Sequence, residues 1–390
     1  MKIAILTYYE SSDNYGQILQ CFALQQYLLN LGHDAYLVKY SPKEEHPSKQ
    51  KRIFNILKKI INITYIKKYI ASKRLQREEL ELKSRNEKLN SQREFELFRK
   101  KYIKSTDNIY HSIDELKNNP PDADIYVCGS DQVWRDSLKQ DNVAGWYLQF
   151  GKKDVQRISY AASIGRNIAK DEEEIFIRYL SAFDAISLRE KKARDYCKTI
   201  GFHNAELVCD PTILLTSDYY QKNLKTKAIL KEKPYVFFYI LNIVSKDEFP
   251  WDVINQQIHN RGWEIKSVCS SGYYQARNII PETDNILATV PEWIELIQNA
   301  EFIITSSFHG AVFSILFHKP FIVLPLKGDH ADANDRIKSL LNELDLNSQL
   351  CFNGEDIIKA FDFSIDWDSV EDKIALLRQS GEKFIERNFV

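Results

Sequence analysis

The sequence predicts an α/β protein with two parallel sheets, one in each half of the chain. Short apolar runs of strand length alternate with stretches of helical periodicity, which is typical of parallel-sheet domains. The chain has 390 residues, and domains usually hold roughly 100 to 200 residues, so we expect two of them. Hydrophobic residues make up 44% of the chain, which is enough for two separate cores.

Six strands are predicted in the first half of the chain. The first of them, residues 2–6, leads through a polar loop into a helix at 17–31, whose apolar residues recur at helical spacing until Gly32 ends it. Each of the other runs is short, apolar and bounded by polar residues. The predicted strands lie at residues 2–6, 35–39, 125–128, 158–161, 185–188 and 206–208.

The pattern restarts after Asp210 and Pro211. Proline cannot donate to a strand ladder and restricts the residue before it, so we place a domain boundary between residues 211 and 234. The expected domains are residues 1–215 and 230–365, followed by a C-terminal helix at 366–390 that can pack on either of them. The second domain carries predicted strands at 235–241, 264–268, 302–305 and 321–324, and helices at 291–300 and 311–317.

Residues 46–77 interrupt this alternation with ten Lys or Arg side chains and no Asp or Glu. A helix here would be amphipathic and basic, which suits attachment to an anionic membrane surface. An inserted helical hairpin with a solvated basic face explains the pattern equally well. Residues 78–104 alternate in charge sign, as exposed helices do, so the whole insert at 46–104 is predicted to be helical.

Composition and charge exclude several classes of protein. Lys and Arg number 53 against 54 Asp and Glu, and the resulting net charge of −1 gives no overall attraction to nucleic acid. The six cysteines are far apart and no secretory leader follows Met1, so we expect reduced thiols in a cytoplasmic protein. The longest uncharged run, 302–318, contains Ser, Thr and His residues and is a poor membrane span.

Polar loops follow two predicted strands of the first domain. The carboxyl ends of parallel strands are where α/β proteins bind ligands, although turn chemistry and helix capping explain both loops as well. No GxGxxG or GxxxxGK[ST] motif occurs, which disfavours a dinucleotide site and excludes a P-loop. The candidate binding residues of these loops are Asn14, Tyr15, Gly16, Ser130, Asp131, Gln132 and Trp134.

Arg189 stands at the carboxyl end of another predicted strand. Its planar guanidinium suits bidentate contact with a carboxylate or a phosphate. A surface ion pair with Glu190 or Asp184 is an alternative explanation for an arginine at this position.

The most informative stretch joins the predicted strand 302–305 to the following helix. Ser306, Ser307, His309 and Gly310 lie there at a helix N-terminus, where backbone N–H groups and the helix dipole attract anions. A histidine in this place can bind an anion or act as an acid and base, and the alternative is a purely structural histidine.

Three more cationic or titratable side chains, Lys327, His330 and Arg336, follow the next predicted strand. Together with His309 they predict a site for an anionic small molecule at the edge of the second domain. His330 has Asp329 and Asp332 nearby, but this spacing matches no common metal site, so no metal is predicted.

Taken in order, these segments resemble the polysaccharide pyruvyl transferase family. The individual motifs are short, and the ordered set spans most of the chain, from residue 14 to residue 337. The basic segment 46–77 lies outside the pattern. The matching pieces are Asn14-Tyr15-Gly16-Gln17, Gly129-Ser130-Asp131-Gln132-Val133-Trp134, Leu188-Arg189, Asp210-Pro211-Thr212, Thr305-Ser306-Ser307-Phe308-His309-Gly310, Lys319-Pro320-Phe321, and Asn334 with Arg336-Ile337.

The resemblance implies a fold similar to the GT-B glycosyltransferases, with two Rossmann-like domains and a cleft between them. It also implies a reaction in which the enolpyruvyl group of phosphoenolpyruvate moves onto two hydroxyls of a sugar, forming a cyclic ketal and releasing phosphate. Phosphoenolpyruvate is then a co-substrate, and no cofactor or metal is expected. The acceptor is expected to be a polysaccharide or its lipid-linked precursor, which would place the protein on the inner face of the cytoplasmic membrane.

The same resemblance suggests a role for each candidate residue. His309 is expected to be the acid and base, and Arg189 and Arg336 to hold the anionic groups of the donor. Phosphate would meet Lys327 and the 306–310 turn, through the hydroxyls of Ser306 and Ser307 and the backbone of Gly310. The acceptor sugar would meet Asn14 and the loop at 129–134 from the other domain.

Two other functions fit a fold of this kind. A nucleotide-sugar glycosyltransferase shares the architecture, although no pair of glutamates eight residues apart occurs between about residues 231 and 360. A sugar-binding protein without catalytic activity is the second alternative, and the presence of Arg189, His309 and Arg336 argues against it.

Overall fold

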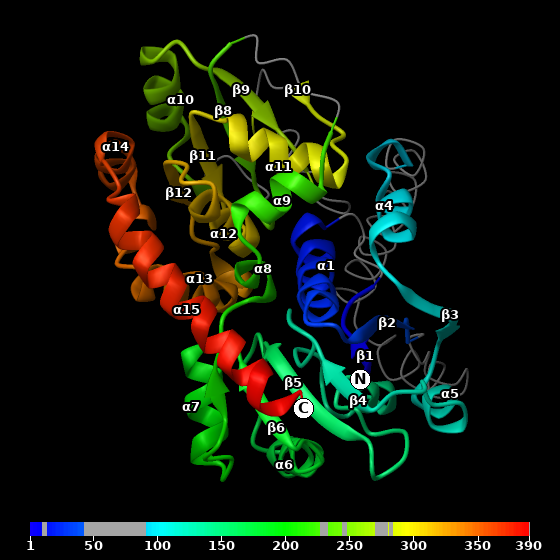
Figure 1. Ribbon diagram of the computed structural model, residues 1–390. Helices are drawn as coiled ribbons and strands as arrows, with labels where there is room; N and C mark the ends of the chain where they lie inside the picture. Colours follow the sequence, from blue (N-terminus) through cyan, green and yellow to red (C-terminus); the bar gives the residue numbers. More distant parts are fainter. Residues whose placement is uncertain are drawn as a thin grey trace, which may run out of the picture.

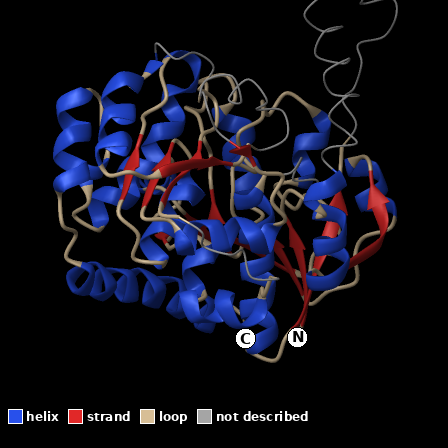
Figure 2. Cartoon of the chain, turned by 90° about the horizontal axis from the view of Figure 1, so that it is seen from above, coloured by secondary structure: helices blue, strands red, loops and turns tan. Residues whose placement is uncertain are grey.

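The computed structural model describes residues 1–9, 14–42, 91–226, 233–243, 248–269, 280 and 284–389. Two parallel sheets form the centres of two Rossmann-like domains (Figure 1). Helices lie on both sides of the strands (Figure 2). The predicted α/β class with two parallel sheets is therefore confirmed. The basic segment 46–77, with its predicted membrane contact, lies outside the described residues.

The first sheet has seven parallel strands in the order β3-β2-β1-β4-β5-β6-β7. All six predicted strands are present, and β3 is the addition. Only the last of its six residues, Tyr110, is buried, because β3 lies at the edge of the sheet, and its sequence therefore lacks an apolar pattern. The strands are β1 (Lys2–Leu6), β2 (Asp34–Tyr40), β3 (Ser105–Tyr110), β4 (Ile125–Cys128), β5 (Gln156–Ala162), β6 (Ala185–Leu188) and β7 (Glu206–Leu207).

The second sheet has five parallel strands in the order β10-β9-β8-β11-β12. Its four longer strands were predicted, and the two-residue edge strand β10 was not, since so short a segment carries no periodicity. The strands are β8 (Tyr235–Tyr239), β9 (Glu264–Ser267), β10 (Asp284–Asn285), β11 (Phe302–Thr305) and β12 (Phe321–Val323).

Helix boundaries follow local capping. The side chain of Asn14 accepts the N–H of Gln17 and so starts α1, and Thr289 and Glu292 form a reciprocal capping box at the start of α11. The helices are α1 (Tyr15–Asn30), α4 (Phe95–Tyr102), α5 (Ile113–Asn118), α6 (Glu173–Leu180), α7 (Lys191–Thr199), α8 (Pro211–Leu214), α9 (Ser217–Asn223), α10 (Trp251–Asn260), α11 (Val290–Asn299), α12 (Phe308–Leu316), α13 (Asn334–Glu343), α14 (Gly354–Asp362) and α15 (Trp367–Asn388), with 3-10 helices η1 (Ser91–Arg93), η2 (Asp141–Gly145), η5 (Gly328–Ala333) and η6 (Asn347–Gln349).

The two domains share one hydrophobic core cluster, which fills most of the space between the sheets. Tyr15 stacks on Trp293 of the other domain with ring centroids 5.3 Å apart, and its hydroxyl donates to the carbonyl of Ala288. Phe95 at the start of α4 packs against the edge of the Tyr15 ring. Tyr15, expected on the acceptor side of the site, is instead fully buried at the domain interface, because α1 turns its first residue toward α11.

The long C-terminal helix α15 packs on both domains (Figure 1). Near its start, Trp367 stacks on His318 of the second domain. Toward its end, Phe384 packs against Tyr160 in the core of the first domain, and Gly381 faces the same tyrosine. The sequence did not decide which domain this helix packs on, and the structure shows that it contacts both.

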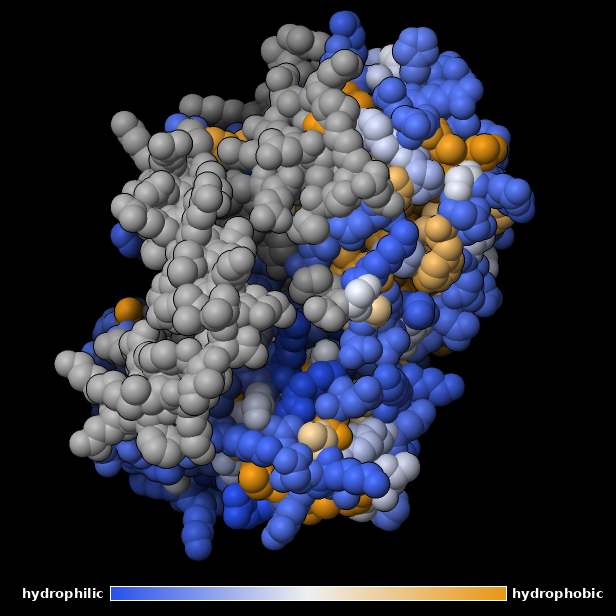
Figure 3. Space-filling view, turned by 180° about the vertical axis from the view of Figure 1, so that it is seen from behind, coloured by the Kyte–Doolittle hydropathy of each residue, from blue (hydrophilic) through white to orange (hydrophobic). Residues whose placement is uncertain are grey.

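The outer surface is mainly polar. Seen from behind, the described surface is mostly hydrophilic, with hydrophobic side chains scattered in small groups (Figure 3). Across the part of the chain that the structure describes, no helix combines the length and the hydropathy that a membrane crossing requires.

The close packing at Gly381 yields a stability prediction. A Cβ atom at this position would lie 2.3 Å from the hydroxyl of Tyr160 and 3.0 Å from Cys209 Sγ. We expect Gly381→Ala to lower the free energy of unfolding by about 1–2 kcal/mol in urea denaturation, although alanine favours a helix over glycine by about 1 kcal/mol. Gln379→Ala, on the exposed side of α15, is the control and should change stability little. A more stable Gly381→Ala protein would contradict the described packing.

Candidate active site

A cavity of about 520 Å³ lies where the two domains meet. Each sheet has a switch point at which the strand order reverses, between β1 and β4 in the first and between β8 and β11 in the second. Ligands of open α/β sheets bind outside the carboxyl ends of the strands at such points. The loops after these four strands all reach the cavity, through Asn14, Asp131, Asn242 and Ser307 respectively.

Asp210 forms the buried base of the site, and its side chain has no exposed surface. One carboxylate oxygen accepts the hydroxyl and the N–H of Thr212, at 2.6 Å and 3.0 Å, which starts α8. The other oxygen accepts from Arg189 Nη1 at 2.6 Å and from the Ser130 hydroxyl at 3.1 Å. It also lies 3.5 Å from His309 Nε2, so Asp210 links segments of both domains.

The surroundings of Asp210 keep it ionised. Burial by itself would raise the pKa of this carboxyl group. The His309 ring, the Arg189 guanidinium and the Thr212 hydrogen bond oppose burial and together hold the pKa well below its ordinary value. Asp210 is therefore a carboxylate at every pH at which the protein is expected to work.

Arg189 lies in a dense ion-pair network. Besides Asp210, its guanidinium contacts Glu190, with Nε 3.3 Å from Oε1, and Asp131, with Nη2 3.7 Å from Oδ1. The expected alternative, an ion pair with Glu190, is thus present, but the pair is buried rather than on the surface. Asp184 has a different partner, the backbone N–H of Arg157. Arg189 is placed at the site as predicted, and carboxylates hold most of its donors.

Arg336, unlike Arg189, lines the cavity. Its Nη1 lies 3.6 Å from Asp131, and its guanidinium shares the Phe308 ring with that of Arg189. Burial and the charge of Arg189 lower the pKa of Arg336 from its ordinary value. Among the described residues its buried Nε has no hydrogen-bond partner, so an anionic ligand would relieve an unfavourable environment.

His309 is in the first turn of α12 and lines the cavity. Its ring lies directly against Gly16 of α1, where a Cβ atom would be 2.1 Å from Nδ1. Only glycine allows this approach, so Gly16 has a definite task at the site. The first polar loop of the first domain and the 305–311 turn of the second therefore meet across the domain boundary.

The two serines of the 305–311 turn form hydrogen bonds with the backbone of the turn and of the neighbouring strand end. The Ser306 hydroxyl donates to the carbonyl of Leu241 and accepts its N–H, while the Ser307 hydroxyl accepts the N–H of Gly310. A phosphate that bound the Ser306 and Ser307 hydroxyls, as predicted, would have to compete with these hydrogen bonds to the backbone. Lys327, a further predicted phosphate ligand, is exposed and does not line the cavity.

The loop after β4 divides into two parts. Asp131 and Gln132 line the cavity, as expected for a ligand-binding loop, and Ser130 lies beneath them against Asp210. Trp134 is fully buried and stacks on Tyr147 with ring centroids 5.2 Å apart, so this predicted acceptor contact belongs to the hydrophobic core.

Asp210 is the main residue that the sequence reasoning missed. Asp210 precedes the predicted boundary at 211–234 and belongs to the matching motif Asp210-Pro211-Thr212, but the sequence interpretation gives it no role. Its position at the carboxyl end of the last strand of the first sheet was the available signal. Several further residues that line the cavity were also not predicted: Gln17, Arg135, Gly165, Arg166, Asn242 and Asp332.

The cavity and the order of its motifs can now be compared with known proteins. The model of the family described as polysaccharide pyruvyl transferase matches residues 14–328. The chain belongs to this family. The matched range includes Arg189, Asp210 and His309, and Arg336 follows it. No curated protein matches the chain.

Solved structures show similarity in fold alone. UDP-GlcNAc 2-epimerase from Methanocaldococcus jannaschii, in complex with UDP-GlcNAc and UDP, is 14% identical with a TM-score of 0.51, covering 97% of this chain and 100% of that chain. The epimerase from Neisseria meningitidis is 10% identical with a TM-score of 0.49 and covers 99% of each chain. The glycosyltransferase VinC is 9% identical with a TM-score of 0.38, covering 98% of this chain and 96% of that chain.

Within the described ranges, no group of three or more His, Cys, Asp or Glu side chains is arranged to hold a metal ion.

The depressed pKa of Asp210 predicts a pH-dependent contribution to stability. Asp210→Asn leaves Arg189 without its closest partner, so we expect a loss of about 3–5 kcal/mol at pH 7 in urea denaturation. A carboxyl whose pKa falls on folding stabilises the protein above its unfolded pKa of about 4. Below that pH the difference between the two proteins should shrink by about 1.4 kcal/mol per pH unit.

The control for this experiment is Asp345→Asn, which removes an exposed ion pair with Lys373. It should change stability little at any pH. A difference between wild type and Asp210→Asn that stayed constant from pH 7 to pH 3 would show that Asp210 is not the buried ion described above.

Proposed function

We propose that the chain transfers the enolpyruvyl group of phosphoenolpyruvate to two hydroxyls of a sugar in a polysaccharide or its lipid-linked precursor, and releases phosphate. The observation that carries this proposal is the cavity at the two switch points, where the incompletely paired Arg336 meets His309 backed by Asp210. Membership of the pyruvyl transferase family supports the same reaction.

The charges around the cavity suit a donor with two anionic groups. Phosphoenolpyruvate carries a phosphate and a carboxylate, and arginine binds both in bidentate fashion. Arg336 supplies a partly buried cation, and Arg135 and Arg166 line the same cavity. Arg189 lies behind them, where its bonds to Asp210 and Glu190 position it and leave Nη2 without a hydrogen-bond partner among the described residues.

His309 is the proposed acid and base. Asp210 faces its Nε2 and would accept the proton on that nitrogen, with the 3.5 Å separation shortening when the substrate binds. Nδ1 is then the nitrogen that would exchange a proton with the substrate, on the side of the ring that lies against Gly16. Proton transfer to C3 of the donor would place positive charge at C2, where a sugar hydroxyl attacks.

The overall reaction balances without an oxidant or a metal. Two C–O bonds form between the sugar oxygens and C2, and the C–O bond to phosphate breaks. Of the two hydroxyl protons, one restores the proton that His309 gave to C3, and the other leaves with the phosphate. Attachment of the basic segment 46–77 to the inner face of the cytoplasmic membrane, which would bring a lipid-linked acceptor close, remains part of the proposal.

Donor binding can be tested without knowledge of the acceptor. A ligand of the folded state raises the thermal midpoint according to RT ln(1 + [L]/Kd). We expect millimolar phosphoenolpyruvate to raise the midpoint of the wild type, and Arg336→Ala to abolish this rise because it removes the partly buried cation that lines the cavity. Arg387→Ala, which removes an exposed arginine paired with Glu206, is the control and should respond as the wild type does.

Other ligands decide between the candidate functions. A rise with UDP-sugars and none with phosphoenolpyruvate would replace pyruvyl transfer by glycosyl transfer. A rise that Arg336→Ala and Arg387→Ala both retain would contradict the proposed role of Arg336.

The role of His309 leads to a kinetic prediction. His309→Ala should slow phosphate release from phosphoenolpyruvate by roughly 100- to 10,000-fold, because the proton donor to C3 is lost. Gly16→Ala should have a similar effect, since its methyl group displaces the ring without removing it. Circular dichroism would show that both variants are folded. Unchanged phosphate release by a folded His309→Ala protein would disprove the assignment.

A further inference from the structure

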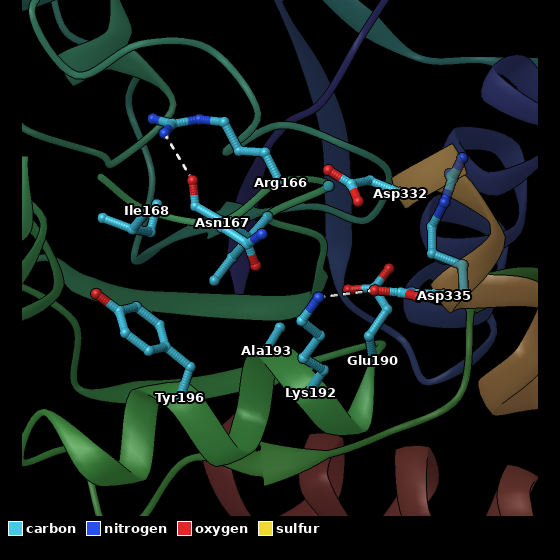
Figure 4. Close-up of a pocket in the computed structure, with 12 residues that line it drawn as sticks. Arg166, Asn167, Ile168, Glu190, Lys192, Ala193, Tyr196, Asp332 and Asp335 are labelled. Carbon is cyan, nitrogen blue, oxygen red and sulfur yellow. Dashed lines mark hydrogen bonds and ion pairs between the residues drawn. The ribbon is translucent and has the colours of Figure 1, made fainter. Parts of the chain in front are cut away.

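A second, smaller cavity of about 290 Å³ lies beside the first one. The two share several lining residues, including Arg336, Arg166 and Asp332, so they meet at Arg336. Figure 4 shows Tyr196 and Lys192 rising from α7 on one side and Arg166, Asn167 and Ile168 approaching from the other. The cavity is thus formed mainly by the first domain and is completed by the second.

One side of this cavity is apolar, and the other side carries carboxylates. Ile164, Ile168, Ala193 and the Tyr196 ring form an apolar face. Carboxylates stand on the other side, and among them Asp335 pairs with Lys192 at 2.9 Å, which joins α13 to α7 across the domain boundary (Figure 4). An apolar face opposite hydrogen-bond acceptors fits a sugar ring, which presents C–H groups on its faces and hydroxyls around its edge.

Glu190 is the decisive residue of this cavity. Only 5% of it is exposed, and its Oε1 accepts from Arg189 Nε, but its buried Oε2 has no hydrogen-bond partner among the described residues. Glu190 is also the N-cap residue of α7, yet its side chain makes no capping hydrogen bond. A buried carboxylate oxygen left without a donor costs free energy, unless a ligand supplies the donor.

The unpaired groups at the junction of the cavities are complementary. Among the described residues Glu190 Oε2 lacks a donor and Arg336 Nε lacks an acceptor, and both side chains line the smaller cavity. A hydroxyl can donate to the first and accept from the second at the same time. A phosphate or carboxylate cannot donate to Glu190, so the anionic donor is the wrong ligand for this position.

We propose that this smaller cavity is the subsite for the acceptor sugar ring, and that Glu190 binds one of the two reacting hydroxyls and takes up its proton. The inference rests on the proposed pyruvyl transfer and adds to it a second substrate subsite and a base. When the hydroxyl oxygen bonds to C2 of the donor, its proton passes to Glu190 Oε2. The proton then leaves with phosphate when the C–O bond to phosphate breaks, which returns Glu190 to the carboxylate form.

Sugar binding can be tested separately from donor binding. The probes are the methyl glycosides of glucose, mannose and galactose, observed by saturation-transfer NMR with the unaltered protein and without phosphoenolpyruvate. We expect at least one glycoside to receive saturation. Ile168→Trp, which fills the cavity from a loop, should abolish the signal and leave the thermal response to phosphoenolpyruvate unchanged.

Glu190→Gln tests the carboxylate itself. The amide keeps the size of the side chain but cannot take up a proton, so phosphate release that depends on the glycoside should fall by about 100-fold or more. Donor binding should persist in this variant. Glu343→Gln, which removes a carboxylate in the neighbouring groove and outside the smaller cavity, is the matched control and should keep full activity.

The outcomes separate the two proposals. No glycoside signal with the unaltered protein, or a signal that Ile168→Trp leaves intact, would overturn the sugar subsite even if phosphoenolpyruvate binds. Full glycoside-dependent activity of Glu190→Gln would overturn the role of the carboxylate. A glycoside signal that Ile168→Trp abolishes, without any response to phosphoenolpyruvate, would leave the sugar subsite standing and disprove pyruvyl transfer.

Discussion

The buried carboxylate of Asp210 is the interaction on which the site depends. It receives hydrogen bonds from Ser130, Arg189 and Thr212 and faces His309, so a single side chain joins the ends of three strands of the first domain to a helix of the second. A buried ion is stable only when its partners are in place. The relative position of the domains at the site and the ionisation of Asp210 are therefore set together.

Close packing between the domains has the same effect on the cavity. Gly16 lets the His309 ring lie against α1, and the aromatic cluster around Tyr15 and Trp293 fills the interface beside it. Since α15 also packs on both domains, packing between the domains holds the walls of the cavity in place. Binding groups that packing already holds in place cost less free energy to order when a substrate arrives.

The two adjoining cavities share charged side chains. Arg135, Arg166 and Arg336 line the larger cavity beside Asp131 and Asp332, and the smaller one combines an apolar face with three carboxylates and three cationic side chains. Arg336 belongs to both cavities, and its Nη1 lies 3.6 Å from Asp131. An anionic donor in the larger cavity and a sugar ring against the apolar face of the smaller one would therefore meet at Arg336.

The sequence by itself determined the fold class, ten of the twelve described strands and the place of His309, Arg189 and Arg336, because strands covered on both faces have continuous apolar runs and their polar ends stand out. Tertiary structure alone decided what depends on distant segments. Strand β3 lies at an edge and carries no apolar pattern, Tyr15 and Trp134 are covered by elements remote in sequence, and Asp210 faces His309 only when the two domains pack together.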